Sequence, residues 1–196
     1  MIIDSSLLRA ALVCVAKVNK HPQLTGVHIS PKYIEATNGH VAVRMEHNID
    51  TDIDLIIRFD GDIPEAAENT KIDLEGGSKA FHYDEDGRLF GFNNLKILDG
   101  RFPDFDKIIP TEKQNVMPFF RLEYLSYPSR MFLSCPSRTF DGLGSVIMEP
   151  SGMKTACRFR FCPLTNKYYG NPVFIVMPCA EDVFEVVARE MRKPEL

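Results

Sequence analysis

Two short runs of alternating apolar and polar residues, joined by an asparagine-glycine pair, constrain the fold of this chain most strongly. Residues 33–37 and 40–46 read YIEAT and HVAVRME, and Asn38-Gly39 lies between them. Asn-Gly suits the two-residue type I′ turn, whose twist matches that of an antiparallel strand pair. The second strand carries its large apolar residues on one face: Val41, Val43 and Met45. The sequence therefore predicts a β-hairpin in a sheet that buries one side only.

Further strand-like runs follow at short intervals, separated by turns that contain glycine. Before Pro110 they are residues 53–59, 70–74, 78–83 and 88–98. A connector at 111–118 leads to three more, at 144–148, 155–161 and 172–177. Between the strands at 53–59 and 70–74, residues 63–68 allow at most a short helix. The pattern is a helix followed by several strands, and after the connector a second, shorter series of helix and strands.

The first predicted helix has two chemically different faces. Asp4, Ser5 and Ser6 are suitable N-caps for a helix that runs to about Asn19. Its apolar stripe consists of Leu7, Leu8, Ala11, Leu12, Val15 and Val18. The opposite face carries three basic residues, Arg9, Lys17 and Lys20. This basic ridge is either an ordinary solvated face or a surface for phosphate groups.

Two more helical segments are expected nearer the C-terminus. Residues 119–125 enter a short helix that Pro128 curtails. Residues 181–192 carry apolar side chains at helical spacing: Val183, Phe184, Val187 and Met191. This amphipathic helix either packs on the core or binds a partner.

Composition narrows the class of protein. The chain has 196 residues, of which 44% are hydrophobic, as in a globular fold with a buried core. A net charge of −4 argues against a protein coated in positive charge. The start of the chain lacks the basic region of a signal peptide and the length of a membrane span, so we expect a cytoplasmic protein without a membrane partner.

The cysteines indicate neither a disulfide framework nor a metal centre. They are odd in number and lack CxxC spacing: Cys14, Cys135, Cys157, Cys162 and Cys179. No histidine stands at ligand spacing to them. We therefore expect free, mostly buried thiols, and neither a metal nor a cofactor.

Residues 95–110 read LKILDGRFPDFDKIIP, which places two aromatics and a proline directly after a strand-like run. This stretch closely resembles the strand and connector that end the middle domain of bacterial sliding clamps, the ring-shaped β subunit of the replicative DNA polymerase. Three further stretches are similar to clamp signatures and occur in the clamp order: LTGVHIS at 24–30, IEATNGHVAV at 34–43 and VFIVMP at 173–178.

The resemblance implies an α+β fold of DNA-clamp-like domains. In such domains, units of one strand, a helix and further strands form antiparallel sheets with helices on one face, and the helices line the hole of the ring. Residues 1–110 resemble a complete clamp domain, 111–179 a shortened second one, and 180–196 form the C-terminal helix and tail. The first clamp domain has no counterpart here, so ring closure would need more copies than in a bacterial clamp.

The resemblance also implies a pocket that binds a short hydrophobic peptide of a replicative polymerase or clamp loader. Carried over by position, the pocket residues are Leu24, Thr37, Gly39, His40, Val41, Ala42, Pro103, Lys107, Ile108, Ile175, Met177 and Pro178. Val41 and Lys107 stand where clamps often have arginine, which favours more apolar peptides. Phe102 and Phe105 are expected to anchor the connector rather than to touch the peptide.

In the same comparison the basic ridge becomes the surface that faces the phosphate backbone of double-stranded DNA. Its expected members are Arg9, Lys17 and Lys20, together with Arg130 and Arg138 from the part of the chain that follows the connector at 111–118. Contacts of this kind hold DNA without reading its sequence.

Three functional hypotheses remain open on the sequence. The first is a non-enzymatic processivity factor that encircles DNA as a homo-oligomer, and the second is a monomeric decoy or adaptor, of phage or prophage origin, that binds host replication proteins. The third is an enzyme with Cys135, Cys157 or Cys162 as nucleophile and His40 or His82 as base. It is disfavoured because no glycine-rich elbow or paired-carboxylate motif accompanies these residues. A related hypothesis places the C-terminal helix in the peptide groove of its own or a neighbouring chain.

Overall fold

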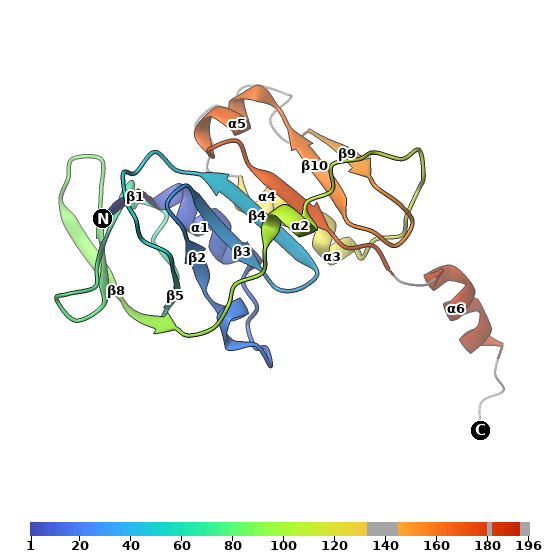
Figure 1. The fold of residues 1–196 in the computed structure, drawn as a ribbon, viewed down its shortest axis with the longest axis horizontal. Helices are drawn as coiled ribbons and strands as arrows, with labels where there is room; N and C mark the ends of the chain where they lie inside the picture. The colour runs from blue at the N-terminus through green and yellow to red at the C-terminus, as the bar shows by residue number, and fades with distance from the viewer. Residues whose placement is uncertain (133–144, 180–181, 193–196) are drawn as a thin grey trace.

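The computed structural model describes residues 1–132, 145–179 and 182–192. Its strands are β1 (Ile2–Asp4), β2 (Val27–Ile29), β3 (Tyr33–Thr37), β4 (Val41–Glu46), β5 (Leu55–Phe59), β6 (Asn69–Asp73), β7 (Lys79–Tyr83), β8 (Leu89–Leu98), β9 (Val146–Pro150), β10 (Cys157–Phe161) and β11 (Val173–Val176). They form one sheet in the order β1-β6-β7-β8-β5-β2-β3-β4-β11-β10-β9 (Figure 1). Every pairing is antiparallel, as expected.

The β3–β4 hairpin is confirmed, but its turn lies one residue later than the Asn-Gly pair suggests. Thr37 pairs with Ala42, and the backbone N–H of Asn38 donates to the carbonyl of Val41 at 3.3 Å, so Gly39 and His40 are the two central residues. Gly39 has a φ of +91°, whereas His40 does not adopt a positive φ. A positive φ at the first central residue alone is the pattern of a type II′ turn, so the type I′ prediction was wrong.

Helix α1 (Ser5–Cys14) begins at the predicted cap, where the Asp4 side chain accepts from the backbone N–H of Ser6. It ends well before Asn19, because Val15 is extended and the backbone N–H of Ala16 donates to the carbonyl of Leu24 at 2.8 Å. The chain then turns into the 3-10 helix η1 (Pro22–Thr25). Val18, which the helical pattern placed on the buried stripe, is consequently 92% exposed.

The remaining helices are short. Residues 63–68 form only a turn, closed by a hydrogen bond from the N–H of Ala67 to the carbonyl of Pro64, which is consistent with the prediction of at most a short helix. Pro128 does not curtail a helix but lies in the first turn of one, where its missing N–H costs nothing. The helices of this part are α2 (Phe105–Ile108), α3 (Leu122–Leu125), α4 (Tyr127–Met131), α5 (Pro163–Tyr168), which was not predicted, and α6 (Val183–Met191).

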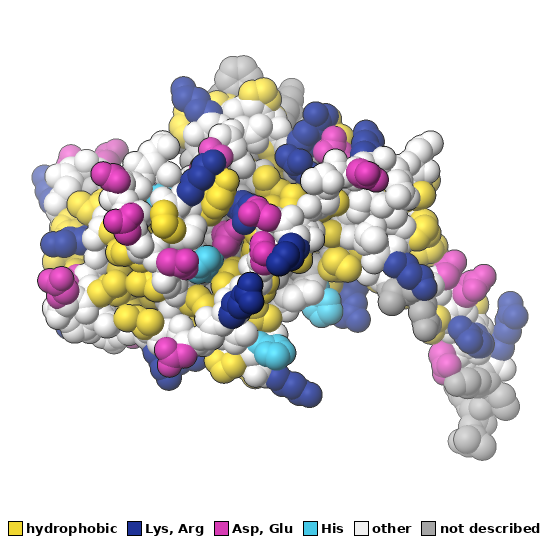
Figure 2. Space-filling model, in the orientation of Figure 1, with side chains coloured by type: hydrophobic (Ala, Val, Ile, Leu, Met, Phe, Trp, Pro, Cys, Tyr) yellow, Lys and Arg dark blue, Asp and Glu magenta, His cyan; other side chains and the backbone are white. Residues whose placement is uncertain are grey.

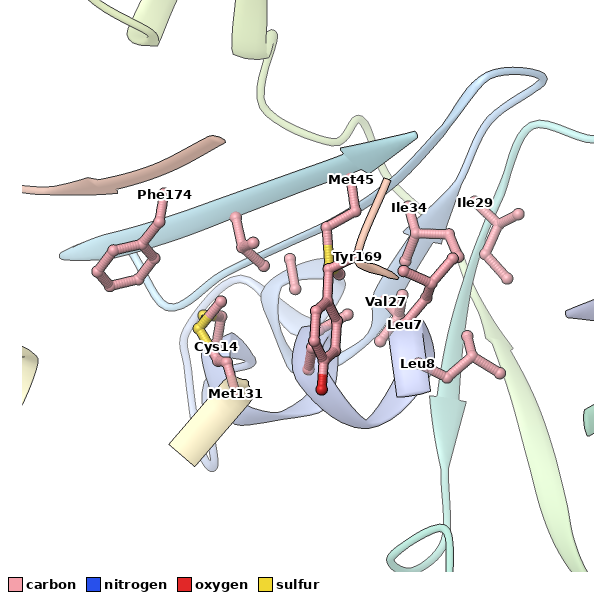
Figure 3. Close-up of a cluster of buried hydrophobic side chains, with 14 of the residues drawn as sticks. Leu7, Leu8, Cys14, Val27, Ile29, Ile34, Met45, Met131, Tyr169 and Phe174 are labelled. Atoms are coloured by element: carbon pink, nitrogen blue, oxygen red, sulfur yellow. The ribbon is translucent and has the colours of Figure 1, made fainter. Parts of the chain in front are cut away.

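The main core lies between the sheet and the helices α1 and α4 on one of its faces (Figure 3). Leu8 and Cys14 of α1 pack there with Met131 of α4 and with Phe174 of β11. This arrangement confirms the α+β class, with an antiparallel sheet and the packed helices on one side. The core is continuous across the predicted boundary at residue 110, because β4 pairs with β11.

A smaller apolar cluster covers the opposite face of the sheet. It consists of Ala16, Leu24, Ala42, Ile56, Leu98, Phe102, Phe105, Ala156 and Ile175. Ala42 is 2% exposed although it alternates with the buried Val41 and Val43. The expectation of a sheet buried on one side was therefore wrong at β4, because residues 99–110 fold back over its outer face.

Candidate peptide-binding groove

A cavity of about 200 Å³ lies where η1, the β3–β4 turn, the connector at 99–110 and the end of β11 meet. Its lining is predominantly apolar and consists of Leu24, Thr37, Gly39, His40, Val41, Ala42, Pro103, Ile108, Ile175 and Met177. Every one of these residues belongs to the predicted pocket. We refer to this cavity as the groove.

Two predicted pocket residues do not line the groove. Lys107 is exposed on α2, and its ammonium group pairs with the Asp104 carboxylate at 3.0 Å. This ion pair holds the pKa of Asp104 below its usual value. Pro178 directly follows Met177 in the sequence but is not among the residues that line the groove.

The hairpin turn is held by its own side chains. The Thr37 hydroxyl donates to the carbonyl of Val41 at 2.6 Å and accepts from the N–H of Gly39 at 3.0 Å. The Asn38 side chain accepts from the N–H groups of His40 and Val41. Because the Thr37 hydroxyl already donates its proton within the turn and the residue is 5% exposed, Thr37 shapes the groove and is not a free donor at the rim.

The turn is also tied to the two segments that continue the groove. The carbonyl of His40 accepts from the N–H of Met177 at 2.8 Å, so the β4 and β11 ends stay in register. The His40 ring stacks on Tyr124 of α3, with centroids 5.4 Å apart. These contacts give the groove one wall with little freedom to rearrange.

The opposite wall is the connector, and two buried aromatics anchor it. Phe102 and Phe105 are 9% and 1% exposed, with ring centroids 5.8 Å apart, so their predicted anchoring position is confirmed. Asp104 caps α2 by accepting from the N–H of Asp106 at 3.2 Å. This fixed backbone presents Pro103 and Ile108 to the groove, and Pro103 offers no competing N–H.

A charged network beneath the connector completes its attachment to the sheet. The Arg44 guanidinium donates to the Glu35 and Asp106 carboxylates, each at 2.5 Å, and lies over the ring of Phe105. Glu35 also contacts His28 at 2.8 Å, and the other ring nitrogen of His28 contacts Asp54 at 2.7 Å. No pattern in the sequence pointed to this network.

The network alters the titration of His28. Burial of the imidazole lowers its pKa, but the hydrogen bonds and charges of Glu35 and Asp54 outweigh burial. The net result is a pKa raised above the usual histidine value. A protonated His28 between two carboxylates therefore strengthens the attachment of the connector.

The predicted basic ridge does not exist as one face of a helix. The Arg9 guanidinium donates to the carbonyls of Pro64 and Ala67, both at 2.8 Å, and so braces the turn beside α1. Lys17 and Lys20 are exposed but lie beyond the end of α1 at Cys14. Arg130 lies over the ring of Tyr127 on α4, and Arg138 is outside the described residues.

A second and larger hollow, of about 990 Å³, brings Lys17 and Arg130 together on the side of α1 and α4. Three carboxylates line the same hollow: Asp60, Asp62 and Glu123. Sequence reasoning missed these acids because they come from distant segments. Their charge reduces the attraction of this surface for phosphate groups.

The cysteine–histidine pair required by the enzyme hypothesis is not assembled within the described residues. Burial raises the pKa of the Cys157 thiol to about 11, whereas hydrogen bonding with the Thr165 side chain lowers the pKa of Cys162. His40 stacks on Tyr124, and His82 bonds to Thr70 and Asn93 in the core. Cys135 is outside the described residues.

Within the described part of the chain, no group of three metal-ligating side chains comes together. None of the helices in the same part is long and apolar enough to cross a membrane.

Solved structures of bacterial sliding clamps share this fold. The clamp of Bacillus subtilis matches with a TM-score of 0.59 and 12% identity, over 93% of this chain and 64% of the clamp. The β subunits from Streptococcus pyogenes and Pseudomonas aeruginosa each match with a TM-score of 0.56 and 13% identity, over 92% and 91% of this chain and 66% of theirs. The chain thus spans slightly less than two thirds of these proteins. No family model and no curated protein matches the sequence.

Proposed function

We propose that this chain is a non-enzymatic, clamp-like accessory of DNA replication whose groove binds a short apolar peptide of a replicative polymerase or clamp loader. One observation carries the proposal: four segments distant in the sequence converge on a single apolar cavity on a sliding-clamp fold. Such a role takes place in the cytoplasm.

The lining suits an extended peptide with one or two large apolar anchors. Leu24, Ala42 and Ile175, which belong to the smaller apolar cluster, form a buried floor that accepts leucine or phenylalanine side chains. Met177 and Ile108 are 39% and 38% exposed and form the adaptable upper walls. Short-peptide grooves gain most of their affinity from a few such buried anchors.

The test is fluorescence anisotropy of a labelled Gln-Leu-x-Leu-Phe peptide, titrated with the full chain. We expect a Kd in the micromolar range, which corresponds to about 8 kcal/mol. The double variant Ile108→Ala, Met177→Ala should lose binding. Ile97→Ala is the control, because Ile97 is also a partly exposed apolar residue, 47% exposed, but lies outside the groove. Absence of binding to the unaltered chain would overturn the proposal.

We further propose that copies of the chain associate to hold double-stranded DNA. The outermost described strands, β1 and β9, have no further strand partner within the described residues, and β9 exposes Val146, Ile147 and Met148. Unpaired strand edges are ready-made contacts for another chain. Salt-sensitive retention on closed circular DNA, but not on the linearised form, would support a closed ring.

A monomeric adaptor or decoy is the second candidate, and the mixed charge of the large hollow favours it. Lys17 and Arg130 share that hollow with Asp60, Asp62 and Glu123, so the surface is not uniformly basic. A chain that binds the peptide but does not remain on closed circular DNA would have this function.

A further inference from the structure

The C-terminal helix α6 carries an apolar stripe that the other described residues leave largely uncovered. Its N-terminus is well formed, since the Asp182 side chain accepts from the N–H groups of Phe184 and Glu185. Yet none of its side chains is buried, and the apolar ones are open to solvent: Val183, Phe184, Val187 and Met191. Figure 1 shows α6 projecting clear of the sheet. Of the two interpretations of this helix, packing on the core was wrong, and binding to a partner stays a prediction.

A helix of this length is marginal in water unless its apolar stripe is covered. Phe184 is 72% exposed, Met191 is 81% exposed and Val187 is 54% exposed, so most of the surface of these three side chains faces solvent. Residues at positions 183, 187 and 191 repeat every four residues, so they lie along one side of the helix. This is the form in which a helix presents anchors to an apolar groove.

We propose that α6 of one copy docks in the groove of a second copy of the same chain, an inference that rests on the groove's proposed capacity for apolar anchors. The groove and the helix match in size and chemistry, because about 200 Å³ of apolar space accepts one or two large side chains such as Phe184 and Val187.

The contacts at the base of the helix direct it away from its own groove. The N–H of Cys179 donates to the carbonyl of Phe119 at 2.7 Å. The rings of Phe184 and Phe119 also make an edge-to-face contact, with centroids 5.4 Å apart. Entry of α6 into the groove of its own chain would break both contacts, whereas docking on a second copy needs to break only the ring contact.

The resulting contact joins different surfaces of the two copies. Each chain carries one donor helix and one acceptor groove, so the contact is heterologous and can continue from copy to copy. A nine-residue helix buries little area, so we expect weak, concentration-dependent association. Docked helices would also compete with the partner peptide for the same anchors.

The test is a complementation experiment by sedimentation velocity over a range of protein concentrations. In the absence of DNA, the full chain should shift toward larger species as concentration rises, and both Phe184→Asp and Ile108→Asp should lose this shift. An equimolar mixture of these two variants should form a one-to-one dimer, because each supplies the part that the other lacks. Glu185→Gln, on the polar side of α6, should associate like the unaltered chain. Circular dichroism verifies that each variant is folded.

The outcomes separate this inference from the function of the groove. Partner-peptide binding combined with unchanged association of Phe184→Asp would overturn the α6 docking and leave the proposed function standing. Loss of association in both variants, restored by mixing, together with no binding of the partner peptide would support the docking and overturn the proposed function. A full chain that stays monomeric at every concentration would overturn the docking outright.

Discussion

The imidazole ring of His28 is stacked on the phenyl ring of Phe102, with centroids 4.7 Å apart and planes inclined by 26°. His28 belongs to β2, and Phe102 belongs to the connector that forms one wall of the groove. This contact therefore couples the protonation of His28 to the position of Phe102 and of the groove wall that Phe102 anchors.

Stability should fall as pH rises through the raised pKa of His28. Because the pKa of His28 is higher in the folded state than the unfolded value of about 6.5, protonation of His28 stabilises the fold. This stabilisation is fully present below the unfolded pKa and is lost as the pH rises through the folded-state pKa. Urea unfolding at a series of pH values should show this loss, and His28→Gln should flatten it. His21→Gln, at an exposed position, should leave the pH dependence intact.

Phe105→Ala should destabilise the chain by roughly 3–5 kcal/mol, because it removes a ring that is 1% exposed and leaves a cavity under the connector. The partner peptide should also bind more weakly, since Pro103 and Ile108 lose their support. Phe92→Ala is the control for the loss of a ring at an exposed site, 56% accessible on β8. Equal losses of unfolding free energy in the two variants would contradict the anchoring role.

Gly170→Ala should be among the most damaging substitutions in the chain. Gly170 has a φ of +58°, and a Cβ there would lie 1.9 Å from the carbonyl oxygen of Glu46. Gly87 also has a positive φ, +75°, but no heavy atom lies within 4 Å of its Cβ position. We expect Gly87→Ala to cost about 1–2 kcal/mol and Gly170→Ala more than about 4 kcal/mol. Thermal unfolding of both variants measures the difference.

Arg9 and Lys17 should separate a structural role from a DNA-binding one. Arg9→Ala removes two charge-assisted hydrogen bonds to the carbonyls of Pro64 and Ala67, so it should lower the unfolding free energy by about 1–3 kcal/mol. Lys17→Ala should leave stability unchanged and reduce the salt-dependent retention on DNA. A stable Arg9→Ala variant with impaired retention would show that Arg9 faces DNA after all.

The strands and the members of the groove could be predicted from the sequence for different reasons. The alternation around Val41 and Val43 is a local pattern, and it located the hairpin directly. No local pattern brings Leu24 next to Met177. Their meeting was expected only because the chain resembles sliding clamps in four stretches, and the cavity shows that they do meet.

The errors arose where distant contacts overrode local preference. The apolar spacing continues to Val18, but the bond between Ala16 and Leu24 draws the chain out of the helix after Cys14. Asn38-Gly39 prefers one turn, yet the side chains of Asn38 and Thr37 stabilise a turn centred on Gly39 and His40. The basic pattern of α1 also concealed that Arg9 is occupied by the carbonyls of a distant turn.

By itself, the sequence determined which segments become strands, because alternation and turn residues act over a few neighbouring positions. It also determined that α6 would be an amphipathic helix. Only the tertiary structure decided that the two parts of the chain share one sheet through β4 and β11 and that His28 and Arg44 fasten the connector. It also decided that no side chain of α6 is buried by the described residues. These outcomes depend on pairings between residues far apart in the chain, whose energies no local pattern encodes.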